Sequence, residues 1–262
     1  MFGDESMVRN IILGNQALTI LETGNHYGNM NASQSFYPES YTPEMRWSAF
    51  LKRRLMVGRV AGFDGHKMFM ADQEHKRGTW FEITQDYVEA NPEGWTDIPE
   101  DILIVTDRTP GVVIGHPVAD CPVIMAYDPR HQALAVGHCS ADLIDKKMPM
   151  LVIDALEEAH ASRDEEILTY VSACAGRTWT YDSYPKWATD EEAWKDAITL
   201  GEDGLYHIDL RKVVLKQLRE RRVGGIMMSP FDTITDPNFY SNSAARVDPS
   251  KKGRNFAGGF FH

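Results

Sequence analysis

The chain has 262 residues, which is enough to bury a large core without requiring a second domain. Its 43% hydrophobic and 25% charged content is typical of a globular protein, and no apolar run is long enough to cross a bilayer, which excludes a membrane-spanning protein. The formal net charge of −11 argues against binding to nucleic acid or anionic membranes, because a polyanion would be repelled at long range.

The first residues and the cysteines bear on the cellular compartment. Residues 1–6 lack the basic flank and apolar stretch of a secretory signal, so we expect a cytoplasmic protein. The cysteines are Cys121, Cys139 and Cys174, an odd set that cannot form a disulfide framework, so they are predicted to be free or metal-bound. We expect one domain over residues 1–262, as a monomer or a homodimer.

The N-terminal part is predicted to contain two hairpins and a helix. Two apolar runs, 11–13 and 17–21, flank the turn residues Gly14-Asn15 and predict the first hairpin. A polar and aromatic loop follows as far as Pro43, which opens a helix predicted to reach Met56. Residues 60–71 predict a second hairpin that turns at Asp64-Gly65, with His66 directly after the turn.

The remainder alternates between short apolar runs and helical patterns. Short apolar runs bounded by turn residues predict buried strands at 111–118, 123–127, 133–137, 167–173 and 226–228. Apolar residues at helical spacing predict helices at 148–161 and 208–221. Residues 182–204 predict a helix with a surface loop, and the tail from Ser229 is rich in turn residues. Strict alternation of strands and helices is missing. We therefore predict the α+β class, a single domain of mixed β-sheets layered with helices.

Two neighbouring strand ends carry residues suited to chemistry. Asp120 and Cys121 follow the strand at 111–118, and His138 directly follows the strand at 133–137. Strand ends are rigid supports, and a thiolate with an imidazole is the pairing that a zinc site or a thiolate nucleophile needs. Cys139 is predicted to face away from His138, because adjacent side chains on a strand point to opposite faces. His116 and His131 are predicted to be structural or exposed.

The pattern resembles the laccase-domain (polyphenol oxidase) family of purine nucleoside phosphorylases. The matching segments, in order, are Ile104-Val105-Thr106-Asp107-Arg108-Thr109-Pro110-Gly111, Ala119-Asp120-Cys121-Pro122-Val123, Ala135-Val136-Gly137-His138, Cys174-Ala175-Gly176, Asp232-Thr233, Phe239-Tyr240-Ser241 and Gly253-Arg254. The resemblance implies that family's fold, which is also associated with Cys-His toxin deamidases. It further implies a metal, zinc rather than copper, held by two histidines and one cysteine, and a purine nucleoside with phosphate as the small-molecule partners.

The resemblance assigns two of the three metal ligands, Cys121 and His138. The family places its other histidine in a Gln-Val-His-Gly segment, which we match to residues 59–62, where Ala61 stands in the place of the histidine. His66 then supplies the third ligand through a shifted hairpin, with His75 as the second choice.

Substrate anchoring differs from the family pattern. The family continues its second histidine as Ala-Gly-Trp-Arg-Gly, whereas Cys139-Ser140-Ala141-Asp142 follows His138 here, and its early Thr-Thr-Arg is also missing. Arg108, Arg177, Arg246 and Arg254 are candidates to compensate. We predict that Arg254, Arg177 and Cys174 line the substrate site.

Three functional hypotheses follow. In the first, zinc on His66, Cys121 and His138 serves a purine nucleoside phosphorylase or an adenosine deaminase, with Asp120 as an acid/base or as a group that orients a ligand. In the second, a metal-free hydrolase or deamidase uses Cys121 as nucleophile and His138 as base, oriented by Asp120 or Ser140. In the third, the chain binds nucleosides without turnover.

Overall fold

The computed structural model describes residues 11–12, 18–71, 78–94 and 98–262. The strands are β1 (Ile11–Ile12), β2 (Leu18–Glu22), β3 (Met68–Met70), β4 (Trp80–Glu82), β5 (Ile102–Thr106), β6 (Val113–Val118), β7 (Val123–Asp128), β8 (Ala133–His138), β9 (Leu168–Val171), β10 (Trp179–Tyr181), β11 (Ile198–Leu200), β12 (Tyr206–Ile208), β13 (Gly225–Met228) and β14 (Asn255–Phe261). The α-helices are α1 (Pro43–Ala61), α2 (Gln85–Ala90), α3 (Ala141–Asp145), α4 (Met148–His160), α5 (Glu191–Trp194) and α6 (Leu210–Glu220).

Two mixed sheets pack face to face and carry helices on their outer faces. The five-stranded sheet has the order β1-β2-β14-β6-β3, and the six-stranded sheet has the order β13-β9-β7-β8-β5-β4. Alternation along β7 and β8 places Met125 and Val136 in the core between the sheets and Ile124 and Ala135 in the core under α4 and α6. Phe50 on α1 packs on the far face of the five-stranded sheet. The predicted α+β fold of layered sheets and helices is confirmed.

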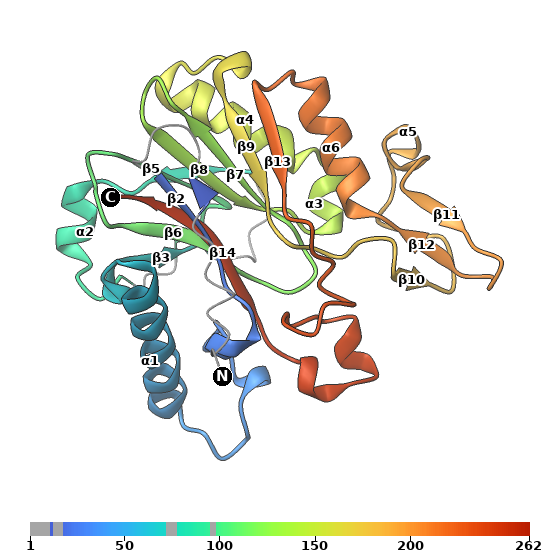
Figure 1. Ribbon diagram of the computed structural model, residues 1–262, viewed down its shortest axis with the longest axis horizontal. Helices are drawn as coiled ribbons and strands as arrows, with labels where there is room; N and C mark the ends of the chain where they lie inside the picture. The colour runs from blue at the N-terminus through green and yellow to red at the C-terminus, as the bar shows by residue number, and fades with distance from the viewer. Residues whose placement is uncertain (1–10, 13–17, 72–77, 95–97) are drawn as a thin grey trace, which may run out of the picture.

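A three-stranded sheet projects from this body. Figure 1 shows β10, β12, β11 and α5 together as an arm on one side, with α1 on the other side of the molecule. Asp145, at the end of α3, accepts hydrogen bonds from the backbone N–H groups of Thr189 and Asp190 and from Nε1 of Trp194. This carboxylate therefore fixes the base of the arm against the helical layer.

The predicted central strands and helices agree with the structure, and the helices at 148–161 and 208–221 correspond to α4 and α6. The first hairpin is present as antiparallel β1 and β2, but its turn residues lie outside the described part of the chain. The tail contains the long strand β14, which the sequence analysis missed. In 182–204 the structure has the predicted helix as the short α5, together with the strand β11, which the sequence analysis did not predict.

The predicted hairpin at 60–71 is wrong. Helix α1 continues to Ala61 and ends at Gly62, whose φ of 87° lies in the left-handed region that glycine adopts most easily. Asp64 then caps a short 3-10 helix, η3 (Gly65–Lys67), by accepting a hydrogen bond from the N–H of His66. Because residues 59–61 are helical, the match of 59–62 to the family's Gln-Val-His-Gly strand is also wrong.

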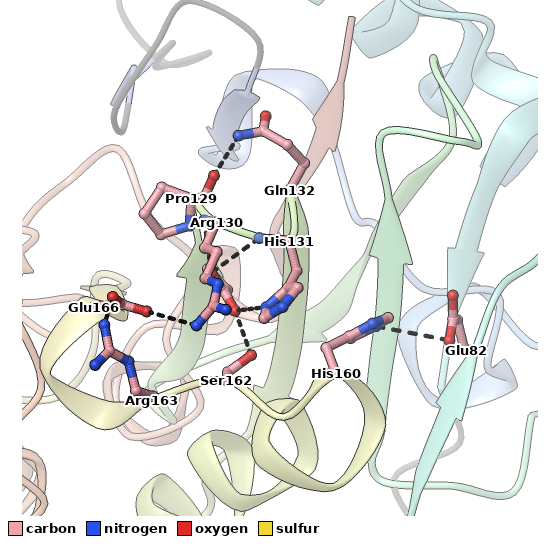
Figure 2. Close-up of polar contacts among 10 residues, drawn as sticks. Glu82, Pro129, Arg130, His131, Gln132, His160, Ser162, Arg163 and Glu166 are labelled. Carbon is pink, nitrogen blue, oxygen red and sulfur yellow. Dashed lines mark hydrogen bonds and ion pairs between the residues drawn. The ribbon is translucent and has the colours of Figure 1, made fainter.

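At the tip of the β7–β8 hairpin, Asp128 ties the turn to the segment after α4. Its carboxylate accepts hydrogen bonds from the backbone N–H of Arg130, from Nδ1 of His131 at 2.6 Å and from the hydroxyl of Ser162. Figure 2 labels these three partners. The ring of His131 stacks on that of His160, with centroids 6.3 Å apart. Burial alone would raise the pKa of Asp128, but the hydrogen bonds lower it overall.

We expect Asp128→Asn to lower the free energy of unfolding by about 2 kcal/mol at pH 7, because charge-assisted hydrogen bonds to a buried carboxylate are lost. An aspartate in the unfolded chain has a pKa of about 4, so the ionised form stabilises the fold above that pH, and the contribution disappears as pH falls through the lower folded-state pKa. Urea unfolding at pH 7 and pH 3 measures this.

The difference between wild type and Asp128→Asn should shrink at pH 3, and an unchanged difference contradicts the assignment. Exposed Asp182 provides the matched control. Asp182→Asn should change stability by less than about 0.5 kcal/mol at both pH values.

Candidate functional site

Cys121 and His138 lie at one end of the β7–β8 pair. Val123 pairs with His138 in the antiparallel ladder, so Cys121, two residues earlier, lies beside the end of β8. Both side chains are half-buried. The ring of His138 lies 6.0 Å from the ring of His116 on β6, centroid to centroid, which places it at the edge of the layer between the two sheets. The structure therefore brings the predicted pair together.

Asp120 holds the turn that carries Cys121. Its oxygen Oδ1 accepts a hydrogen bond from the hydroxyl of Thr233 at 2.8 Å, and Oδ2 accepts one from the N–H of Ser243 at 2.7 Å. Its carbonyl accepts a third from the N–H of Ala175 at 2.7 Å. These contacts hold Asp120 at a φ of 75°, in the left-handed region that aspartate tolerates better than most residues. Both carboxylate oxygens are engaged, so the geometry favours positioning over acid/base work.

Arg254 reaches the same place from the other sheet. Asn255, the first residue of β14, pairs with Val118, the last residue of β6, so Arg254 lies beside the segment that leads to Asp120. Burial lowers the pKa of the Arg254 guanidinium, while the nearby Cys121 and Asp120 favour its charged form. Sequence reasoning predicted Arg254 as a substrate residue, and the structure places its cation where the charge of Cys121 acts on it.

His116 is a fully buried neighbour of the pair. Its Nε2 lies 3.4 Å from the carbonyl of Val136, and Nδ1 has no hydrogen-bond partner among the described residues. Burial lowers the pKa of His116 to about 4, so the imidazole is neutral at physiological pH. The sequence analysis predicted His116 to be structural or exposed, and its burial excludes the exposed alternative.

The thiols of Cys139 and Cys174 are completely buried. Cys139 packs under the helices on the face opposite to His138, as strand alternation predicted. Burial raises the pKa of Cys139 well above its ordinary value, and burial raises that of Cys174 to about 12, with Arg211 opposing the shift. A buried protonated thiol is a poor nucleophile, so Cys121 is the reactive candidate. Cys174 neighbours Asp120 through Ala175 but is completely buried, which does not favour contact with a substrate.

His66 and Arg177 do not join this site. His66 precedes β3, where Met68 pairs with Val113 at the start of β6, whereas Cys121 follows the end of that strand. The length of β6 therefore separates His66 from Cys121, and the structure corrects His66 as the third ligand. Arg177 lines a surface pocket of the arm with Asp203 and His207, a pocket that includes neither Cys121 nor His138.

The donor set for a metal is incomplete in the described part of the chain. Among residues 11–12, 18–71, 78–94 and 98–262, no group of three or more His, Cys, Asp or Glu side chains is arranged to hold a metal ion. Cys121 and His138 offer the sulfur and nitrogen donors that zinc prefers. His75, the second choice for the third ligand, lies outside the described residues.

A comparison of the sequence with known families decides the relationship. Residues 47–258 match the family described as multi-copper polyphenol oxidoreductase laccase. The chain belongs to this laccase family. The match covers α1 through most of β14 and includes Cys121, His138 and Arg254.

Solved structures show the same fold. The hypothetical protein YfiH of Bacillus licheniformis superposes with a TM-score of 0.73 at 18% identity, covering 94% of this chain and 93% of its own. YlmD of Geobacillus stearothermophilus gives a TM-score of 0.74 at 16% identity, over 94% and 92% of the two chains. A Neisseria meningitidis protein of the DUF152 family gives 0.70 at 16% identity, over 97% and 99%. Among curated protein sequences, none matches this laccase-family chain.

Sequence reasoning missed one residue near Arg254 altogether. Phe36, in the 3-10 helix η2 (Gln34–Phe36), lies with its ring centre 4.5 Å from the guanidinium carbon of Arg254. Phe36 belongs to the long loop before α1, and no motif marks it. An aromatic residue in a loop rich in Gly, Asn and Ser was the available signal.

We expect Asp120→Ala to lower the free energy of unfolding by about 2 to 4 kcal/mol, because it leaves the donors of buried Thr233 and half-buried Ser243 without their acceptor. Urea unfolding followed by circular dichroism measures the change. Asp120→Asn keeps one acceptor oxygen and should lose less. A loss below about 0.5 kcal/mol for the alanine variant is incompatible with a positioning role for this carboxylate.

We expect the buried neutral His116 to make the protein acid-sensitive. The unfolded imidazole, with a pKa of about 6.5, binds a proton before the folded one does, so stability decreases as pH falls from about 6.5 towards the folded value of about 4. The loss between these limits is about 3 kcal/mol. His116→Phe removes this contribution, so urea unfolding at pH 7.5 and 4.5 should show a smaller acid loss than in wild type. Equal acid losses would refute the assignment.

Proposed function

We propose that this laccase-family chain is a zinc enzyme that acts on purine nucleosides, by phosphorolysis or by deamination of adenosine. The observation that carries the proposal is the meeting of Cys121, His138 and the Arg254 cation at one edge of the space between the sheets. Membership of the laccase family supports it. A thiolate and an imidazole suit zinc, and a guanidinium suits a phosphate or another anion.

Cys121 and His138 would hold the metal. For the third ligand we favour His75, because Gln73 and His75 have the spacing of the family's Gln-Val-His segment. Strand β3 also runs parallel to β6, towards the end of β6 that Cys121 follows. When bound, zinc supplies a Lewis acid that lowers the pKa of water to about 7 and so provides a nucleophile at neutral pH.

The chain's own residues would do the remaining work. Arg254 would hold the phosphate, or the part of the substrate that becomes negative. It would do so through the guanidinium N–H groups that do not bind the carbonyl of Gly253. Asp120 would keep the Cys121 turn in place through its hydrogen bonds to Thr233 and Ser243. In this assignment Arg254 substitutes for the arginine that follows the second histidine in the family pattern and that this chain lacks.

The metal-free alternative has less support. The two groups named to orient His138 are engaged elsewhere. The oxygens of Asp120 bind Thr233 and Ser243, and the hydroxyl of Ser140 donates to Asp142 at 2.5 Å. A protein that binds nucleosides without turnover remains an outcome of the experiment below.

Elemental mass spectrometry of the purified protein should find about one zinc per chain. Cys121→Ser, His138→Ala and His75→Ala should each lose it, whereas His66→Ala, the matched control, should retain it. No zinc in wild type would overturn the metal assignment, and loss in His66→Ala with retention in His75→Ala would reverse the choice of third ligand.

The zinc-loaded protein should release free base from inosine only when phosphate is present, or convert adenosine to inosine without it. Chromatography of the reaction mixture separates the two reactions. A chelator should abolish either one. Activity that survives chelation but is destroyed by iodoacetamide would favour the metal-free hydrolase, and nucleoside binding without turnover would favour the binding protein.

A further inference from the structure

The guanidinium of Arg254 is held from one side by an aromatic ring. The Phe36 ring lies 4.5 Å from the guanidinium carbon, within the range of a cation–π contact. A cation–π contact is an attraction between the charge and the ring, so it uses none of the N–H donors of the guanidinium. One nitrogen, Nη1, donates to the carbonyl of Gly253 at 2.9 Å. No other hydrogen bond of this guanidinium is found within the described part of the chain, so its remaining donors are available to an anion near Cys121.

The backbone of Arg254 is fixed by the same loop that carries Phe36. The N–H of Arg254 donates to Oδ1 of Asn29 at 2.9 Å, and its carbonyl accepts a hydrogen bond from the N–H of Met30 at 2.9 Å. The loop therefore holds the backbone of Arg254 by hydrogen bonds and its guanidinium by contact with the Phe36 ring.

Helix α1 in turn anchors the loop. Nη1 of Arg53 donates to the carbonyl of Asn29 at 2.9 Å and to the hydroxyl of Tyr37, the residue after Phe36, at 2.7 Å. Arg46, seven residues earlier on the same face of α1, donates to the carbonyl of Ala32 at 3.1 Å. These contacts come from a long helix that packs on the sheet, so the position of Phe36 does not depend on a bound ligand.

We propose that Phe36 is a positioning residue, whose ring holds the guanidinium of Arg254 in the orientation that binds a phosphate group beside Cys121. This inference rests on the proposed function, in which Arg254 holds the phosphate. It predicts that Phe36 contributes to anion affinity only through Arg254.

Titration calorimetry of inorganic phosphate into the zinc-loaded, full-length protein tests the inference. Phe36→Leu should weaken phosphate binding about three- to tenfold, the scale of a cation–π contact, whereas Phe36→Tyr, which keeps the ring, should stay within about twofold of wild type. Tyr184→Leu removes an exposed aromatic residue on the arm and should leave the affinity unchanged.

A double-mutant cycle distinguishes positioning from a general loss of structure. In the background of Arg254→Gln, Phe36→Leu should have no further effect on phosphate affinity. An equal effect in both backgrounds, or none in wild type, overturns the inference.

The failure of the inference and the failure of the proposed function are distinguishable. Wild-type protein that binds no phosphate overturns the inference, yet it leaves zinc-dependent deamination intact. Coupled phosphate binding by Phe36 and Arg254 without any nucleoside turnover supports the inference and overturns the proposed function.

Discussion

The candidate site depends on the carboxylate of Asp120. Cys121 lies in a turn between two sheets, outside strands β6 and β7, so its position depends on hydrogen bonds from other segments. Asp120 supplies them by accepting from Thr233 and Ser243, two positions more than a hundred residues away in sequence. One buried carboxylate therefore holds the C-terminal loop that precedes Arg254 against the Cys121 turn. Because the carboxylate is buried, these hydrogen bonds are costly to break.

The second constraint is the alternation of side chains along β8. His138 lies at the edge of the layer between the sheets, and Cys139, the next residue, lies under the helices. Two residue types that both bind metals are thus separated by one peptide unit and have opposite environments. Burial leaves Cys139 protonated and inert, whereas the half-buried Cys121 remains accessible to chemistry.

The sequence predicted those elements whose formation depends on residues close together in the chain. The apolar runs of β6, β7 and β8 identify the central strands, and their ends identify Cys121 and His138. The failures involve contacts between distant segments. Helix α1 outlasts its predicted end because Val57 and Ala61 pack on the sheet, and β14 was missed because glycines interrupt its apolar run and hide a strand whose pairing partners lie far away in sequence. The contact between Phe36 and Arg254, 218 positions apart by their numbers in the chain, follows from no periodicity at all.

The pairing of Val123 with His138 also limits how this chain can change length. An insertion of one residue within β8 would exchange the two faces of every position beyond it, turning Cys139 towards the other sheet and His138 towards the helices. The arm formed by β10, β11, β12 and α5 has no such restriction. Its base is held by Asp145, and among the strands that the structure describes its own pair with one another alone. Variation in length among homologous chains should therefore accumulate in the arm, while the distance between Cys121 and His138 in the sequence stays constant.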